Sequence, residues 1–162
     1  MDIVFEDAWR QGDATQARQA KLFWGWLNLG LVEERNRWAS ELCCMAYDGD
    51  QLVGVSTAAL RVLPQWPARL AMYRCAVAPE FRRRELAKRL TARSIEILQR
   101  WSADNPAEKV LGLSAIIPAG ELGAMPLRPA WPDHGLHLNL AALTPQAGQI
   151  RIRWFDHARL EG

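Results

Sequence analysis

The sequence predicts an α/β domain with a mixed, mostly antiparallel sheet that is flanked by helices. Two observations favour the sheet: β-forming runs lie on either side of an Asp-Gly turn, and a continuous apolar run follows later in the chain. Between them, from Phe81 onward, apolar residues recur with helical spacing. A chain of 162 residues suits one hydrophobic core, so we expect a single domain over 1–162.

The first strand and two helices are expected near the beginning of the chain. "IVFE", residues 3–6, is a short apolar run that suits a strand. Asp13 is a helix-capping residue type, and apolar residues recur from Ala14 until Gly30 ends the helix. A second, short helix is expected over 32–39, where the charged residues indicate a solvated face.

Three strands of an antiparallel meander are expected next. The runs 41–47 and 51–62 lie on either side of the Asp-Gly turn, where glycine adopts positive φ without steric cost. The third strand is "RLAMYRCAV", residues 69–77. Pro79 closes this strand because proline has no N–H to donate to a sheet ladder.

A crossover and a hairpin complete the predicted sheet. The helix that starts at Phe81 places its main apolar residues on one face: Leu86, Leu90, Ile97 and Trp101. "KVLGLSAII", residues 109–117, then suits a buried strand parallel to its predecessor. "LHLNLAAL" and "IRIRWF" alternate polar and apolar residues and form a terminal hairpin.

The composition excludes several classes of protein. No stretch approaches the roughly 18 apolar residues of a membrane span, and the first residues do not resemble a signal peptide, so we expect a cytoplasmic protein. The cysteines, Cys43, Cys44 and Cys75, provide neither a disulfide framework nor the paired spacing of a zinc site. A net charge of +2 is too small to indicate general nucleic-acid binding.

The junction "RCAVAPEFRRRELAKRL", Arg74 to Leu90, concentrates positive charge between a strand and a helix. From 82 to 100 there are seven basic residues and two acidic ones. Because the first amides of a helix bind anions, arginines at this place indicate a site for a ligand with several phosphates. The alternative is a solvated helix face with local ion pairs, which explains most runs of charge.

The same stretch resembles the signature of the GCN5-related N-acetyltransferase (GNAT) superfamily. "CAVAPEFRRRELAKRL" is similar to a strand end, a short turn and the R/Q-x-x-G-x-G/A motif that opens the next helix. Arg82 stands at the first motif position and Ala87 at the last, while Glu85 replaces the first glycine. The order of expected elements resembles the superfamily over about residues 3 to 155.

The resemblance implies an N-acetyltransferase that uses acetyl-CoA as cosubstrate and an amine of a small molecule or protein as acceptor, by direct transfer. The backbone of Cys75, Ala76 and Val77 would line the pantetheine arm. The pyrophosphate would lie over the junction amides. These belong to Arg82, Arg83, Arg84, Glu85, Leu86, Ala87 and Lys88. The side chain of Glu85 would crowd the pyrophosphate and its negative charge would repel it. Alternatively, Glu85 points outward, pairs with Arg82 or Arg89 and acts as a favourable charge at the helix start.

The segment 118–135 is too rich in proline and glycine for a helix. Family members have a helix here that often supplies a tyrosine as general acid, and this chain has no tyrosine in the segment. No catalytic residue is therefore assigned, and the segment is expected to be a substrate lid that holds Trp131, Asp133 and His134. His134 and His137 alone do not indicate a metal site, and Cys75 is expected to be a small buried residue of its strand.

Two other functions compete with the enzyme. Glu85 and the missing tyrosine favour a catalytically degenerate member that acts as a binding or regulatory module. The arginine-rich helix could serve a nucleic-acid binder, although the small net charge argues against it. The eight tryptophans suit a homodimer interface.

Overall fold

The computed structural model describes residues 2–62, 68–117, 130–131, 138–143 and 149–158. The chain forms two compact units. The first contains Met1–Ala59 and Arg74–Leu98, and the second contains Leu60–Tyr73 and Gln99–Gly162. The single domain expected from the length of the chain stays a prediction.

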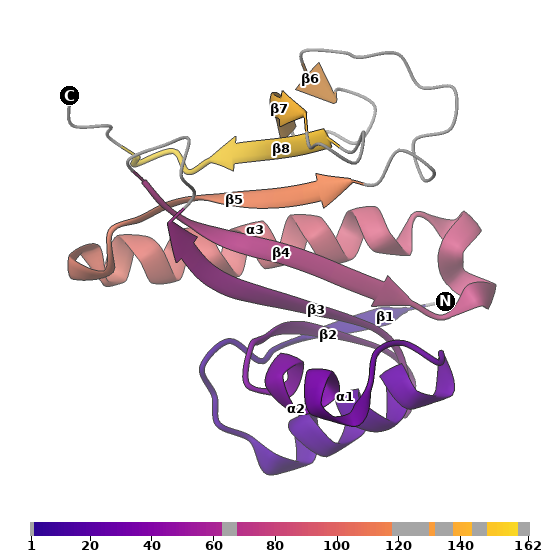
Figure 1. Ribbon diagram of the computed structural model, residues 1–162. Coiled ribbons are helices and arrows are strands. Elements are labelled where there is room, and N and C mark those ends of the chain that lie inside the picture. Colours follow the sequence, from indigo (N-terminus) through magenta and orange to yellow (C-terminus); the bar gives the residue numbers. More distant parts are fainter. Residues whose placement is uncertain (1, 63–67, 118–129, 132–137, 144–148, 159–162) are drawn as a thin grey trace. The chain divides into compact units, whose positions relative to one another are not determined.

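The strands of the first unit follow one another in the order in which they occur along the chain, β1-β2-β3-β4 (Figure 1). They are β1 (Ile3–Asp7), β2 (Leu42–Asp48), β3 (Gln51–Val62) and β4 (Arg69–Val77). β1 pairs with β2 and β2 with β3, both antiparallel. Gly49 has φ 60° in the turn between β2 and β3, so the meander and its hairpin turn are confirmed.

Helices α1 (Ala14–Trp26) and α2 (Val32–Ala39) lie between β1 and β2 in the sequence, as predicted. The carboxylate of Asp13 accepts hydrogen bonds from the amides of Thr15 at 2.8 Å and Gln16 at 3.0 Å. These bonds satisfy two of the amides that a helix start leaves without a partner. Gly30, with φ 68°, lies in the connection between the two helices.

The helix after β4 begins later than the apolar pattern predicts. Pro79–Arg84 form a 3₁₀ helix, η1, and the α-helix α3 extends over Leu86–Asp104. Glu85 between them has φ 58° and ψ 20°, the left-handed conformation, which an α-helix cannot contain. The expected start of the α-helix at Phe81 is therefore wrong, because Phe81 lies in η1 and the α-helix begins at Leu86.

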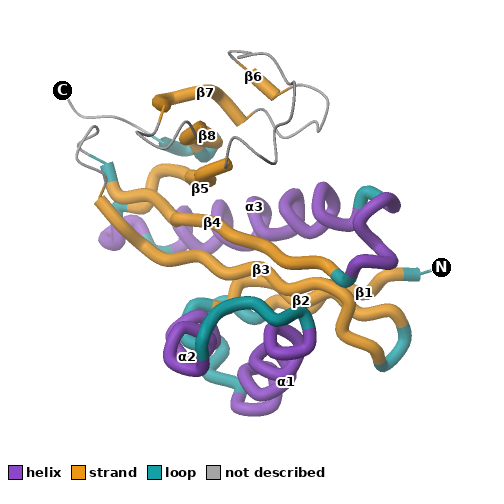
Figure 2. Tube along the Cα trace, turned by 45° about the vertical axis from the view of Figure 1, so that its right-hand side comes forward, coloured by secondary structure: helices purple, strands orange, loops and turns teal. Residues whose placement is uncertain are grey.

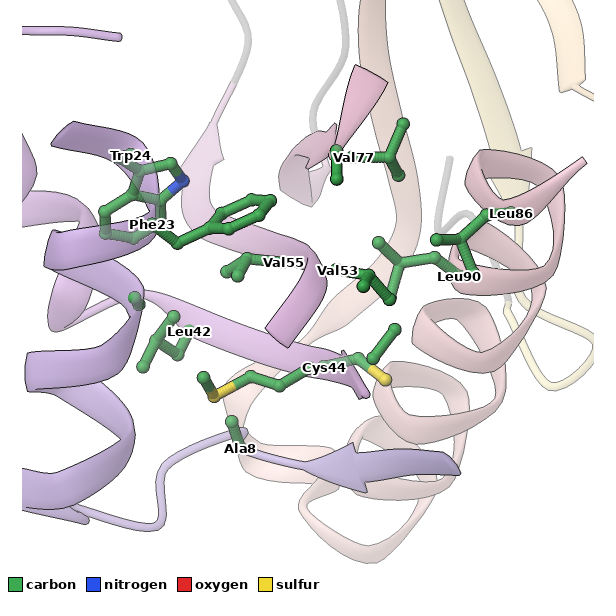
Figure 3. Close-up of a cluster of buried hydrophobic side chains, with 14 of the residues drawn as sticks. Ala8, Phe23, Trp24, Leu42, Cys44, Val53, Val55, Val77, Leu86 and Leu90 are labelled. Atoms are coloured by element: carbon green, nitrogen blue, oxygen red, sulfur yellow. The ribbon is translucent and has the colours of Figure 1, made fainter. Parts of the chain in front are cut away.

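One hydrophobic core of the first unit lies on both sides of its strands (Figure 3). Phe23 and Trp24 of α1 approach from one side, and Leu86 and Leu90 of α3 approach from the other, with Val53 of β3 between them. All five side chains are buried. The apolar pattern of α1 is therefore confirmed only in part, because Ala20, Phe23 and Trp24 are buried whereas Leu22 and Trp26 are exposed.

The buried face of α3 differs slightly from the predicted one. Leu90, Ser94 and Leu98 are fully buried, whereas Ile97 and Trp101 are only half-buried. The hydroxyl of Ser94 donates to the Leu90 carbonyl at 2.7 Å, which satisfies this polar group within the core.

Within the second unit, which includes the first half of β4, the strand order is β4-β5-β8-β7-β6 (Figure 2). The first half of β4 pairs in parallel with β5, and β5 pairs antiparallel with β8. β7 joins the other edge of β8 and pairs with β6. The bounds are β5 (Val110–Ile117), β6 (Ala130–Trp131), β7 (Leu138–Leu143) and β8 (Gln149–Trp154), and a short 3₁₀ helix, η2 (Pro106–Glu108), precedes β5. The crossover and the terminal hairpin are confirmed.

Gly112 of β5 lies in a tight contact of the second unit. A Cβ at this position would lie 2.7 Å from the carbonyl oxygen of Arg153 and 3.3 Å from Leu70. Leu70 is fully buried and lies against this strand.

Among the described residues, no helix is long and apolar enough to cross a membrane.

Candidate active site

The second half of β4 carries three of the residues expected to line the cofactor. Cys75 is exposed, Ala76 is half-buried and Val77 is buried. The expectation of a buried cysteine is therefore wrong, because Cys75 is exposed on β4. The pairing of β4 with β5 includes Arg69 to Met72 and stops before these three residues.

The end of β4 is held by the neighbouring strand of the same unit. The amide of Ala78, directly after Val77, donates to the carbonyl of Val53 at 2.8 Å. Ala78 itself is fully buried. The backbone that leads from the strand into η1 thus has a defined position within this unit.

The residues of the expected anion site lie in two kinds of helix, a 3₁₀ helix and the first turn of an α-helix. Arg82, Arg83 and Arg84 lie in η1, whereas Leu86, Ala87 and Lys88 form the first turn of α3. The first backbone bond of the α-helix is donated by Arg89 to the carbonyl of Glu85 at 3.1 Å. Three amides of the first turn therefore precede the helical bonding pattern, as at any α-helix start.

Glu85 adopts a backbone conformation that glycine reaches without steric cost. Its side chain is exposed. Among the contacts described for Leu86 to Lys88, none comes from the carboxylate of Glu85. Glycine would therefore suit position 85 for a second reason besides the space it leaves. Any other residue there adopts the left-handed conformation at a cost in free energy.

Some of the positive charge of α3 is engaged within the first unit. The guanidinium groups of Arg89 and Arg93 lie 5.3 Å and 6.0 Å from the ring centre of Phe5. Arg93 also forms an ion pair with Glu96 at 3.0 Å. Such contacts are the ordinary use of a charged helix face.

A cavity of about 220 Å³ lies in the first unit, beside β3 and β4. It is lined by residues of α1, the connection to α2, α2 and the two strands: Trp24, Leu29, Gly30, Trp38, Val55, Thr57, Arg74, Cys75 and Ala76. The rings of Trp24 and Trp38 meet edge to face with centres 5.5 Å apart. Cys75 and Ala76 thus belong both to the expected cofactor strand and to this cavity.

Arg74 gives the cavity its charge. Its guanidinium carbon lies 4.5 Å from the ring centre of Trp38. Partial burial lowers the pKa of Arg74 from its ordinary value, with smaller effects from Glu41, Arg37 and Glu34. No role was predicted for Arg74 from the sequence, although a charged residue within the apolar run of β4 was a signal.

Trp24 and Trp38 were also missed, because tryptophans on helices usually serve packing. Only the folded chain shows that the two rings form the wall of a cavity. Sequence spacing could not have brought them together with Arg74, since the three residues come from three separate elements.

Two cysteines of the first unit are poor nucleophiles. Burial raises the pKa of the Cys43 and Cys44 thiols from 9.0 to about 12. A thiol must lose its proton to react, so both remain inert near neutral pH. Burial also raises the pKa of Tyr47, whose hydroxyl donates to Gln19 at 2.5 Å.

Ser102 and His157 approach each other in the second unit, with the Ser102 oxygen 3.0 Å from Nε2 of His157. The Ser102 hydroxyl donates its single proton to the carbonyl of Val110. His157 therefore donates to Ser102 rather than accepting from it. This arrangement is the reverse of a nucleophile that donates to its general base.

The expected lid falls mostly outside the described residues. Asp133, His134 and His137 lie there, and Trp131 lies in the short strand β6. Within the described ranges, no group of three acidic, histidine or cysteine side chains is arranged to hold a metal ion.

The comparison with protein families decides the identity of this chain. A family model described as the acetyltransferase (GNAT) family matches residues 4–109. The chain belongs to the GNAT family. It is therefore an acyltransferase of the N-acetyltransferase class, with acetyl-CoA as cosubstrate. A comparison of the sequence with curated proteins finds no match.

Solved structures of acetyltransferases share the fold of this GNAT chain. A putative acetyltransferase from Salmonella typhimurium with its cofactor acetyl-CoA has a TM-score of 0.64 at 14% identity, with 98% of each chain covered. The ribosomal-protein-S18-alanine N-acetyltransferase from Escherichia coli has a TM-score of 0.62 at 16% identity, with 98% of this chain and 97% of that chain covered.

An acetyltransferase of the GNAT family from Streptococcus pneumoniae has a TM-score of 0.61 at 12% identity, with 95% of this chain and 99% of that chain covered. At these identities the likeness shows the fold alone. The predicted fold class, an α/β GNAT-like mixed sheet with a strand-helix-strand crossover, is confirmed.

Proposed function

We propose that this GNAT chain transfers the acetyl group of acetyl-CoA directly to an amine of a small molecule or protein, and that the strand-to-helix junction binds the cofactor. The family match carries this proposal. The related fold that holds acetyl-CoA in the Salmonella typhimurium structure supports it.

The proposed cofactor residues divide into a strand group and a junction group. The backbone of Cys75, Ala76 and Val77 runs along the pantetheine arm. The backbone from Arg82 to Lys88 surrounds the pyrophosphate, and the first amides of α3 supply donors with the positive end of the helix dipole behind them. Arg82, whose side chain is exposed, adds charge at the same place.

The degenerate alternative differs from the enzyme at one position. Glu85 with φ 58° places an acidic residue beside the proposed pyrophosphate. The exposed carboxylate leaves the first-turn amides without a bond from it among the described contacts, which favours retained binding. We therefore propose that the chain is an active enzyme rather than a degenerate member. The affinity for acetyl-CoA tests this choice.

Calorimetry with acetyl-CoA tests the cofactor site. We expect binding in the micromolar to low-millimolar range, and absence of heat at millimolar ligand would overturn the proposal. Arg82→Gln should weaken binding about two- to fivefold, because an exposed charge contributes at most about 1 kcal/mol. Arg18→Gln, an exposed arginine of α1, is the matched control and should leave binding unchanged.

Two further proposals concern the cell and the assembly. We propose a cytoplasmic location, supported by three cysteines that form no disulfide in the structure. A homodimer stays a prediction of the tryptophan content, and size measurement in solution tests it.

A further inference from the structure

The cavity beside β4 has features that a purely structural packing defect would not require. Arg74 is the one charged residue among its described lining residues. Its guanidinium carbon lies 4.5 Å from the ring centre of Trp38, and among the described residues no hydrogen bond or ion pair of Arg74 is found. A guanidinium over a ring face still has N–H donors that a ligand can use.

Nearby acids do not neutralise this arginine. Glu41 forms an ion pair with Arg37 at 3.9 Å, and Glu34 accepts the amide of Leu31 at 3.1 Å. Neither carboxylate lies in the cavity lining. The described lining thus contains a cation and no acid, although Glu41 and Glu34 are near enough to act on the pKa of Arg74.

Trp38 lines the cavity, but its Nε1 does not add a donor to it. This nitrogen is fully buried and has no hydrogen-bond partner among the described residues, so it does not open into the cavity. Thr57 adds a hydroxyl to the lining.

The remaining walls are apolar. Trp24, Leu29 and Val55 contribute rings and branched side chains, and two of them are seen in the close-up of the core (Figure 3). Leu29 is 39% exposed and belongs to a group of exposed apolar residues at the end of α1 and the start of α2: Leu22, Trp26, Leu29, Leu31 and Val32. Apolar surface thus extends from the cavity onto the adjoining part of this unit.

The size of the cavity limits its ligand. At about 220 Å³ it lies below the roughly 300 to 1,000 Å³ typical of drug-sized ligands. It suits a group the size of one amino acid. Because Cys75 and Ala76 line it, a ligand bound there lies beside the strand that we propose for the pantetheine arm.

We propose that this cavity is the acceptor pocket of the chain, and that Arg74 selects an acceptor amine that also carries a carboxylate and an apolar or aromatic group. The inference rests on the proposed acetyl transfer for its meaning. The carboxylate binds the guanidinium of Arg74 in its plane, and the apolar group lies against Trp24 and Leu29. Arg74 is then a specificity-determining residue and takes no part in proton transfer.

Direct binding of three small probes tests the inference without the cofactor. L-phenylalanine carries the amine, the carboxylate and an aromatic ring, L-phenylalaninamide lacks the charged carboxylate, and glycine lacks the ring. Calorimetry and quenching of tryptophan fluorescence report binding. We expect phenylalanine to bind about tenfold or more tightly than its amide, since hydrogen bonds to charged groups contribute about 1.5 to 3 kcal/mol. Glycine should bind more weakly than phenylalanine.

Variants identify the residue responsible. Arg74→Met keeps a long apolar side chain over Trp38 and should abolish the preference for phenylalanine over the amide, while Arg74→Lys should keep part of it. Arg18→Gln is the matched control and should bind like the wild type. Circular dichroism and thermal unfolding confirm that each variant is folded. Equal binding of the acid and the amide, no binding of phenylalanine, or an unchanged preference in Arg74→Met would overturn the inference.

Acetyl-CoA calorimetry on the same preparations separates the two proposals. Binding of acetyl-CoA without binding of phenylalanine leaves the proposed function intact and removes the assignment of the cavity. Binding of phenylalanine without acetyl-CoA supports the pocket and its Arg74 preference and removes the proposed acetyl transfer.

Discussion

The two halves of β4 each begin with an arginine, and the two arginines have different surroundings. Arg69 in the second unit donates to the carboxylate of Glu108 at 2.7 Å and to its carbonyl at 3.1 Å. Arg74 in the first unit lies over the ring of Trp38. One arginine thus has its hydrogen-bonding capacity used by the protein, and the other has it available.

The neighbouring residues differ in the same way. Leu70 and Ala71 after Arg69 are fully buried, and this half pairs with β5. Cys75 after Arg74 is exposed, and it lines a cavity. A single strand therefore contributes to the core in one half and lines a cavity in the other. The edge of β4 that pairs with β5 over Arg69 to Met72 makes no such backbone pairing beyond them.

The largest effect should come from the paired half. Leu70→Ala removes a fully buried side chain and should lower the free energy of unfolding by about 2 to 5 kcal/mol through lost burial and a cavity. Urea denaturation measures this change. Cys75→Ala in the exposed half is the control, with an expected change within about 0.5 kcal/mol. Similar losses in both variants would break the comparison.

The buried thiols should make stability depend on alkaline pH. The pKa values of Cys43 and Cys44 are about 12 in the folded chain, against an ordinary value of 9.0. Below pH 9 both states keep these protons, whereas above it the unfolded state releases them first. The free energy of unfolding therefore falls as pH rises from 9 toward 12.

Urea denaturation between pH 8 and pH 10.5, with a reductant present, measures this dependence. The double variant Cys43→Ala, Cys44→Ala is expected to lose less stability over this range than the wild type. Parallel curves for the two proteins would show that other groups cause the dependence. Cys75→Ala should follow the wild type, because it leaves both buried thiols in place.

Removing either arginine of β4 should have separate consequences. Arg69→Met loses an ion pair whose two side chains are 35% and 40% exposed, so we expect a loss of about 0.2 to 1 kcal/mol in unfolding free energy. Arg74→Met should change stability less and alter ligand preference instead. Thermal unfolding and probe binding measured on both variants test this, and a loss of ligand preference in Arg69→Met would contradict it.

The smallest expected change concerns the residue between η1 and α3. Glu85→Gly relieves a left-handed conformation at φ 58°, and the gain is partly offset by the greater flexibility of glycine in the unfolded chain. We expect about 0.5 kcal/mol of stabilisation. Chemical denaturation measures it, with Glu80→Gly in η1 as the control that should destabilise.

The same variant tests the cofactor site. If the carboxylate of Glu85 repels the pyrophosphate, Glu85→Gly and Glu85→Gln both tighten acetyl-CoA binding. If only the backbone matters, the glycine variant alone does so. An unchanged affinity for acetyl-CoA in both variants would show that Glu85 has no effect on cofactor binding.

Much of this fold was predictable because local patterns agree with the final structure. Asp13 caps the helix that its position indicates, and the Asp-Gly turn joins the strands that surround it. The prediction was wrong where the backbone leaves the right-handed helical conformation. The apolar spacing from Phe81 predicted a continuous helix, but the left-handed residue Glu85 separates a 3₁₀ turn from α3.

The sequence by itself determined the order of elements, the family signature around Arg82 and the family to which the chain belongs, because these depend on residues that are close together along the chain. Only the tertiary structure placed Trp24, Trp38 and Arg74 around one cavity and left Cys75 exposed. A binding pocket depends on contacts between elements distant in sequence, and neither periodicity nor a motif records them.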